Sequence, residues 1–205
     1  MKQPSWRVFV ICKKSAYQQL VIDGDERRRI KRLLEEENPS VRHLERSHAA
    51  HVATIEDARR VLKELGAEAT FHDLADLGSA VEADLVVTLG GDGTLLWASH
   101  AVGPDTPMLA INTAPNTSVG YFCGGDRSDL SEILAAARDR KLRRTYLTRM
   151  LVVVDSQVVS DRVLNDALFS ASCPAATTKY VAYHRGLEEE QRSSGVWIGP
   201  AAGST

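Results

Sequence analysis

The feature that most constrains the fold is the segment LVVTLGGDGTLL at residues 85–96, where an apolar run meets a glycine loop. Residues 85–89 do not alternate between apolar and polar side chains, which is typical of a strand covered on both faces. Three glycines then enclose one carboxylate, Asp92, and apolar residues resume immediately. A buried strand followed by a tight loop and a helix predicts part of an α/β sheet.

The flanking sequence shows the same succession of strands and helices. We expect further strands at residues 8–12, 67–71 and 108–112. We also expect a charged helix that ends before Pro39 and a helix over residues 94–102. A last helix should start near Asp126 or Ser128, with an apolar face formed by Leu130, Ile133, Leu134 and Ala137.

One more helix is predicted from its end signals. Thr54, with Asp57 three residues later, is suited to cap a helix, and Gly66 is placed to end it. The apolar face of this helix is formed by Ile55, Ala58, Leu62 and Leu65. Just upstream, His48 and His51 have a spacing that could place two imidazoles on one helix face. No third ligand is near them in sequence, so we interpret them as a surface pair.

The character of the chain changes at about residue 142. Residues 1–142 alternate strands and helices, which predicts an α/β domain with a parallel, Rossmann-like sheet covered by helices on both faces. Residues 143–205 contain short β-rich runs separated by polar turns and no helical period. This part predicts the beginning of a second, all-β domain.

Composition and charge exclude several classes of protein. The formal net charge is -2, so no global field attracts the chain to nucleic acid or to an anionic membrane. No apolar run is long enough to span a bilayer, and the first residues do not resemble a signal or transit peptide. Three widely separated cysteines favour reduced thiols. These observations predict a cytoplasmic protein without nucleic-acid or membrane partners.

The glycine loop indicates phosphate chemistry. Glycines at the carboxyl end of a strand let a phosphate approach backbone N–H groups, and ligands of open α/β sheets bind at this edge. The alternative is a tight turn in which Asp92 caps the following helix. Neither common glycine motif is present, because Leu96 stands where the dinucleotide fingerprint requires glycine and no lysine follows for a nucleoside-triphosphate loop.

The segment GGDGT resembles the signature of the NAD kinase superfamily, which also contains lipid kinases. Lipid kinases usually carry an Asn-Glu pair directly after this motif, whereas here Asn165 and Asp166 follow far downstream, as in the NAD kinases proper. The segments LAINTAPNTSVGYFCG and QRSSGVWIGPAAGST are similar to two further family segments. Together with LERSHAAH, they most resemble the mitochondrial-type NAD kinases and their bacterial relatives. In this family the β domain continues well beyond Thr205.

The resemblance implies a role for each matching residue. Asp92 would be the catalytic base that accepts the proton of the ribose hydroxyl. The phosphates of ATP would be bound by Gly90, Gly91, Gly93, Thr94 and Arg192. The NAD-binding residues would be Asn112, Tyr121, Asn165, Asp166, Ser194 and Thr205. The implied reaction is ATP-dependent phosphorylation of the 2'-hydroxyl of the adenosine ribose of NAD, with Mg²⁺ accompanying ATP, no metal held by side chains of the protein, and a homodimeric assembly.

Several of these residues have simpler interpretations. The pair Asn165-Asp166 could be a β-turn, and Asn112 could cap a turn. Tyr121 could be a core aromatic at a strand end, and Arg192 could be a surface arginine. In addition, Pro200-Ala201-Ala202 replaces a polar, hydroxyl-rich stretch of the family. Two other functions therefore stay open, namely a catalytically silent NAD(P)-binding module and a kinase for lipids or sphingoid bases.

Overall fold

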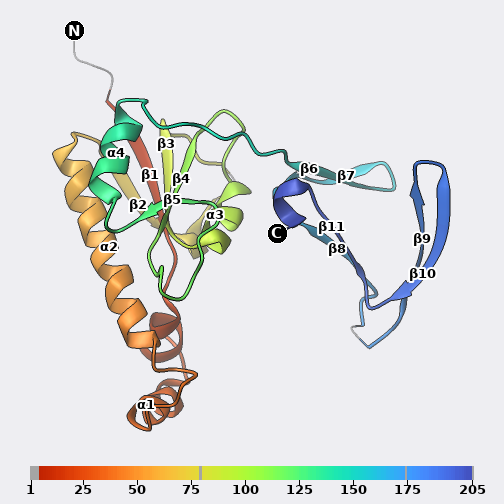
Figure 1. Cartoon of the computed structure of the whole chain (residues 1–205), viewed down its shortest axis with the longest axis horizontal. Helices are drawn as coiled ribbons and strands as arrows, with labels where there is room; N and C mark the ends of the chain where they lie inside the picture. The colour runs from red at the N-terminus through yellow and green to blue at the C-terminus, as the bar shows by residue number, and fades with distance from the viewer. Residues whose placement is uncertain (1–4, 79, 174, 205) are drawn as a thin grey trace. The chain divides into compact units, whose positions relative to one another are not determined.

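The computed structural model describes residues 5–78, 80–173 and 175–204. The chain divides into two compact units between Arg144 and Thr145. This division lies two residues beyond the boundary expected from sequence. We call the first the α/β unit and the second the β unit, and describe each by itself (Figure 1).

The α/β unit is built on a five-stranded sheet with the order β2-β1-β3-β4-β5. Each neighbouring pair is parallel, which confirms the predicted architecture. The strands are β1 (Arg7–Cys12), β2 (Glu68–Asp73), β3 (Leu85–Gly90), β4 (Met108–Asn112) and β5 (Cys123–Asp126). Every residue of the central strand β3 is buried, as the absence of alternation predicted.

Strand β5 was not predicted, because its sequence CGGD contains two glycines and no β-branched residue. It exists because its backbone pairs with β4, with a register shift between Ala110 and Ile111. The strand is therefore a product of its neighbour rather than of its own side chains.

Helices cover both faces of this sheet (Figure 1). On one face α2 (Leu44–Glu64) and α4 (Leu130–Arg138) contribute Leu62 and Leu134 to a core shared with Val87 of β3. On the other face α3 (Asp92–Ser99) and the residues after it pack Ala98 and Val102 against β1 and β3. Two layers of helices around one sheet give β3 its complete burial.

The charged segment near the N-terminus folds as a small helical layer of its own. It contains η1 (Gln18–Ile22), a single π-helical turn, and α1 (Arg27–Glu35), which ends before Pro39 as predicted. Its core consists of Val21, Ile30, Val41 and Leu44. A short 3-10 turn, η2 (Leu74–Asp76), follows β2.

The predicted start of the long helix is wrong. Helix α2 begins at Leu44, ten residues before Thr54, and the buried Thr54 hydroxyl donates to Ala50 O within the helix. The predicted end is confirmed, because Gly66 follows the helix with a φ of 72°. A threonine can satisfy its hydroxyl inside a helix as well as at its start, so the capping pattern was ambiguous.

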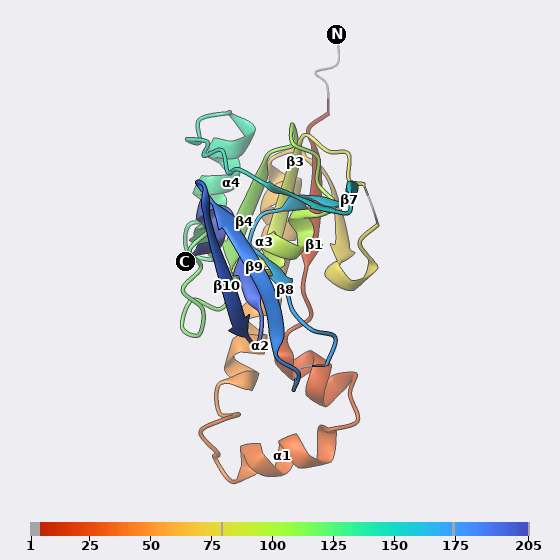
Figure 2. The same ribbon diagram turned by 90° about the vertical axis from the view of Figure 1, so that its right-hand side faces the viewer.

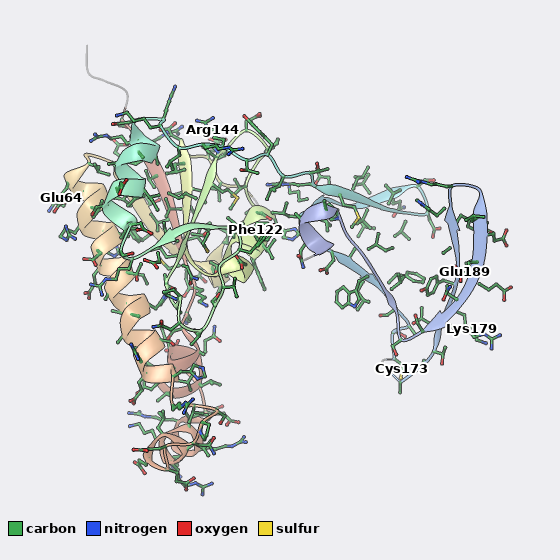
Figure 3. All side chains as sticks on the ribbon, in the orientation of Figure 1. Glu64, Phe122, Arg144, Cys173, Lys179 and Glu189 are labelled. Carbon is green, nitrogen blue, oxygen red and sulfur yellow. The ribbon has the colours of Figure 1, made fainter. Side chains whose placement is uncertain are left out.

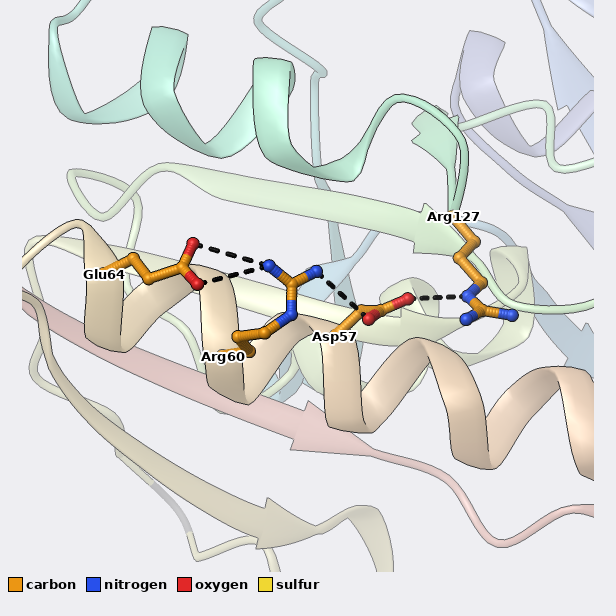
Figure 4. Close-up of polar contacts among 4 residues, drawn as sticks. All are labelled: Asp57, Arg60, Glu64 and Arg127. Carbon is orange, nitrogen blue, oxygen red and sulfur yellow. Dashed lines mark hydrogen bonds and ion pairs between the residues drawn. The ribbon is translucent and has the colours of Figure 1, made fainter.

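Polar contacts join α2 to the connection between β5 and α4 (Figure 4). The Arg127 guanidinium donates from Nε to Asp57 Oδ2 at 2.7 Å. Arg60 contacts Asp57 at 3.2 Å and Glu64 at 3.3 Å on the same helix face. These exposed pairs orient side chains at the helix surface and contribute little free energy each.

The described residues of the β unit form three antiparallel strand pairs, in agreement with the predicted all-β class. The pairs are β6 (Met150–Val154) with β7 (Gln157–Val163), β8 (Ala167–Phe169) with β11 (Val196–Ile198), and β9 (Thr178–His184) with β10 (Leu187–Ser193). Figure 2 shows β9 and β10 as a long hairpin. Strand β10 was not predicted, because its sequence LEEEQRS is mostly charged. A single turn, η3 (Ala201–Ser204), follows β11.

None of the helices within the described ranges is both long and apolar enough to cross a membrane. The three cysteines Cys12, Cys123 and Cys173 are free, as expected.

Candidate functional site

The candidate site is centred on Asp92, which begins α3 directly after the carboxyl end of β3. Its Oδ2 accepts a hydrogen bond from Tyr121 N and its Oδ1 accepts one from Phe122 N, both at 2.8 Å. Phe122 is labelled in Figure 3. Gly91 occupies the N-cap position and no side-chain cap bond is made, so the interpretation of Asp92 as the N-cap is wrong. The half-buried carboxylate instead ties the β4–β5 loop to the glycine loop.

A thiol lies beside this carboxylate. Cys123 Sγ is 3.9 Å from Asp92 Oδ1. Burial, followed by the charge of Asp92, raises the pKa of the Cys123 thiol to about 11. The thiol therefore stays protonated at neutral pH and acts as a weak donor to Asp92 rather than as a competing anion.

The glycines are required by close packing around the loop. A Cβ on Gly90 would overlap Thr94 Oγ1, and one on Gly91 would lie 2.9 Å from Ser118 Oγ. Thr94 itself is buried, and its N–H donates to Gly91 O at 2.9 Å. The N–H groups of Asp92 and Gly93 lie ahead of the helix ladder, and Gly93 is exposed. The loop therefore presents the N–H groups of Asp92 and Gly93 as backbone donors at the start of α3. The buried side chain of Thr94 packs against Gly90 and supports the loop.

The loop between β4 and β5 closes over the glycine loop. Asn112 is buried, donates from Nδ2 to Ser118 O at 2.9 Å and accepts from Ala114 N at 3.1 Å. Gly120 has a φ of 67°, and a Cβ there would lie 2.5 Å from Asn112 Nδ2. Asn112 thus holds the loop, as its turn-capping interpretation proposed. Tyr121 is 67% exposed, so its interpretation as a core aromatic is wrong.

The β unit carries a second group of predicted residues. Asn165 and Asp166 follow β7, and Asn165 Nδ2 donates to Asp166 Oδ2. Gly199 lies so close to this pair that a Cβ there would be 2.6 Å from Asn165 O, and Gly203 lies against the same carbonyl. The Asn-Asp pair and Gly203, which come from two segments named by the family resemblance, therefore lie side by side in the β unit.

The remaining predicted residues of the β unit lie on or after its long hairpin. Arg192 on β10 is exposed and stands opposite Lys179 on β9. Ser194 is exposed, and its carbonyl accepts from the Thr178 hydroxyl at 3.4 Å. Thr205 lies outside the described residues.

The structure thus brings the predicted residues together in two groups. The group in the α/β unit contains Gly90, Gly91, Asp92, Gly93, Thr94, Asn112 and Tyr121. In the β unit, contacts join Asn165 and Asp166 to Gly199 and Gly203. The roles assigned to these residues stay predictions. Within the described ranges, no three His, Cys, Asp or Glu side chains gather as a metal site.

Sequence reasoning missed one residue of this region. His51 is 3% exposed, so its interpretation as part of a surface pair is wrong. Its ring contacts Thr113 Oγ1 at 2.9 Å and Lys13 O at 2.7 Å. A signal was present, because His51, Ile55, Ala58 and Leu62 continue one helical stripe. Polarity led us to place on the surface a residue whose spacing places it in the core.

The chain matches known proteins along most of its length. The profile of the ATP-NAD kinase N-terminal domain matches residues 27–142, more than half of the chain. A protein of Oryza sativa subsp. japonica named "Probable NADH kinase" is 29% identical over 191 residues, which are 82% of this chain and 59% of that protein. The NAD kinase of Symbiobacterium thermophilum is 32% identical over 60% of this chain and 44% of its own length.

A solved structure has the same fold. The crystal structure of an NAD kinase from Archaeoglobus fulgidus in complex with ATP matches with a TM-score of 0.56 and 19% identity, over 97% of this chain and 62% of the other. The chain therefore spans about half the length of the relatives it matches. From the matched domain and the shared fold we conclude that this chain belongs to the NAD kinase family.

Proposed function

We propose that the chain is part of an ATP-dependent NAD kinase, which transfers the terminal phosphoryl group of ATP to the 2'-hydroxyl of the adenosine ribose of NAD. The observation that carries this proposal is the position of Asp92. A half-buried carboxylate stands between exposed glycine backbone and a fully buried strand, at the edge of a parallel sheet where ligands of such folds bind.

The proposed chemistry needs a proton acceptor beside the ribose hydroxyl. The 2'-oxygen attacks the γ-phosphorus, the bond from that phosphorus to the bridging oxygen breaks, ADP leaves, and the hydroxyl proton passes to Asp92. The bonds from Tyr121 N and Phe122 N use two of the roughly four acceptor positions of the carboxylate and fix its orientation. General-base catalysis contributes about 10²–10⁴-fold, so much of the rate enhancement must come from positioning.

The phosphates of ATP would lie at the start of α3. The N–H groups of Asp92 and Gly93 point away from the helix ladder there, and the helix dipole favours negative charge at this end. We expect Mg²⁺ to enter with ATP, because Mg²⁺ in phosphoryl-transfer sites is held largely by substrate phosphates and one or two carboxylates.

NAD would be held by the second group of predicted residues. An amide and a carboxylate, Asn165 and Asp166, match the hydrogen-bonding groups of a ribose diol and a carboxamide. The exposed ring of Tyr121 is available to stack on the dinucleotide. We further propose a cytoplasmic location, from the cysteines and the first residues of the sequence. From the family resemblance we propose a homodimer, which light scattering of the purified protein would test.

The deciding experiment measures NADP after incubation of the purified chain with ATP, Mg²⁺ and NAD. We expect product, and we expect Asp92→Asn to lower kcat by about a hundredfold or more, the range of general-base catalysis. The matched control is Asp57→Asn, which removes a carboxylate of the same unit whose partners are Arg60 and Arg127. Equal activity of the wild type and Asp92→Asn would contradict the role of Asp92.

One observation favours a second function, a catalytically silent NAD(P)-binding module. Both Asp92 oxygens already accept backbone N–H groups, so this carboxylate would stay satisfied without any substrate. Pro200-Ala201-Ala202 also lacks the hydroxyls that the family resemblance leads us to expect. Thermal stabilisation by NAD or NADP without product would identify this function. Phosphorylated lipid with NAD unchanged would instead identify a lipid kinase.

A further inference from the structure

The hydrogen bonds of the buried His51 of α2 are compatible with only one tautomer of its neutral ring. Its Nε2 lies 2.7 Å from Lys13 O, and because a carbonyl only accepts, Nε2 must carry the hydrogen. In the neutral ring, Nδ1 then accepts from the Thr113 hydroxyl at 2.9 Å. Burial lowers the pKa of His51, and the nearby charges of Lys13 and His48 lower it further. The hydrogen bond to Lys13 O acts in the opposite direction but is outweighed, so the neutral ring is favoured.

The two partners of His51 follow the strands on either side of β3. Lys13 follows β1 and Thr113 follows β4, and the sheet order is β1-β3-β4. Lys13 N donates to Leu89 O at 3.4 Å and Thr113 N donates to Gly90 O at 3.0 Å. The two partners of His51 therefore contact the last two residues of β3 from both sides, immediately before the loop that carries Asp92.

The hydrogen bond from Thr113 to His51 also fixes the start of the loop between β4 and β5, which we call the covering loop. Thr113 is the first residue after β4, and the loop it begins returns to Asp92 through the N–H groups of Tyr121 and Phe122. The base of the glycine loop and the base of the covering loop thus share one hydrogen-bonded residue, Thr113. A shift of Thr113 would move both loops relative to the Asp92 carboxylate.

We propose that His51 is a positioning residue for the Asp92 loop, acting through Lys13 and Thr113 without contacting substrate. At 3% exposure its ring is out of reach of a ligand. This inference rests on the proposed function for its kinetic consequence, because displacement of a reacting group by about 1 Å can reduce a rate about a hundredfold. Its structural consequence, the order of the two loops, does not depend on turnover.

The experiment compares four variants of the full chain. His51→Leu removes both hydrogen bonds, Thr113→Val removes one, and His51→Gln retains an amide donor and an acceptor. The control Thr54→Val removes a buried hydroxyl bond one turn further along α2, where the partner is Ala50 O in the same helix. We expect kcat to fall about tenfold or more in His51→Leu and Thr113→Val, to recover most of that loss in His51→Gln, and to stay unchanged in Thr54→Val.

Hydrogen exchange keeps the test independent of catalysis. We expect the amides of Thr113, Tyr121 and Phe122 to exchange about tenfold faster in Thr113→Val and in His51→Leu, with no change in α4. Exchange equal to that of the wild type at these amides, or a loss of stability with unchanged kcat, would overturn the proposal. A wild-type chain that forms no NADP would contradict the proposed function, while the exchange rates would still decide whether His51 orders the loops.

Discussion

The two units of the chain differ in how their strands are stabilised. Among the described residues, 24 of the 26 buried apolar side chains belong to the α/β unit, and the other two are Val163 and Leu164. In the β unit, apolar strand residues remain exposed, among them Leu151, Val158, Phe169 and Trp197. The first unit is held by side-chain packing between layers, and the second by strand pairing.

Turn geometry explains how two strand pairs of the β unit, β6–β7 and β9–β10, form with so little burial. The β6–β7 turn has positive φ at Asp155 (49°) and Ser156 (65°), and the β9–β10 turn at Arg185 (50°) and Gly186 (81°). Two consecutive left-handed residues match the natural twist of a hairpin. Local turn chemistry thus specifies the pairing, whereas isolated hairpins gain only marginal stability in water. The difference teaches that regular strands do not imply a packed core.

The largest expected effect compares a buried with an exposed leucine. Leu89→Ala in β3 should lower the free energy of unfolding by about 3 kcal/mol, because it leaves a cavity at a fully buried position. Leu151→Ala in β6, where the side chain is 57% exposed, should cost less than about 0.5 kcal/mol. Urea unfolding followed by circular dichroism measures both. Equal costs would show that Leu151 is covered in solution.

A pair of glycines separates backbone strain from packing. Gly120→Ala should cost about 2–3 kcal/mol, because alanine is strained at a φ of 67° and its Cβ would crowd Asn112. Gly186→Ala in the β unit has the same kind of φ and open space around it, so it should cost only about 1 kcal/mol. Thermal unfolding of the two variants gives this comparison. A smaller cost at Gly120 would mean that the covering loop adapts.

The same substitution at two buried threonines should have opposite signs. In the β unit the Thr178 hydroxyl accepts from Ala171 N at 2.9 Å, so Thr178→Val should cost about 1–2 kcal/mol. In β3 the buried Thr88 hydroxyl has no hydrogen-bond partner, so Thr88→Val should stabilise the protein by about 1 kcal/mol. Equilibrium unfolding tests the sign directly. Destabilisation by Thr88→Val would indicate a water that satisfies this hydroxyl.

The pH dependence of stability should reflect His51. Its pKa is lower in the folded protein than in the unfolded chain, mainly through burial, so the unfolded chain binds more protons as the pH falls below about 6.5. Stability should therefore decrease on acidification from pH 7.5 to 5.5, by at most about 1.4 kcal/mol per pH unit. Denaturation at both pH values should show a smaller decrease in His51→Gln. His184→Gln, at an exposed position of the β unit, is the control and should retain the full decrease.

The smallest expected effect concerns the ion pairs at the helix surface. Asp57→Asn should cost about 0.5 kcal/mol, because Asp57 contacts two arginines but remains partly exposed. Hydrogen bonds from Arg127 and Arg60 lower the pKa of Asp57, so this contribution is present at neutral pH and is lost as the pH falls through the pKa of the folded state. Added salt should reduce the cost. A salt-independent cost would point to packing instead.

Much of the fold was predictable because local patterns encode it. Three features depend on residues close together in sequence: the apolar run of β3 without alternation, the helix end at Gly66, and the change near residue 142 from alternating strands and helices to short β-rich runs. The strands β5 and β10 were not predictable in this way. Two glycines and three glutamates have poor strand propensity, and only pairing with β4 and β9 makes them strands.

The candidate site shows the same division. The sequence by itself determined that Asp92 stands among glycines at the end of a buried strand, because both features lie within twelve consecutive residues. Only the tertiary structure decided what Asp92 and His51 contact. Asp92 meets Tyr121 across 29 residues of sequence, and His51 meets Thr113 across 62. Hydrogen bonds between residues so far apart in sequence depend on how helices and strands pack. The periodicity of apolar residues predicts single helices and strands but not which of them pack together.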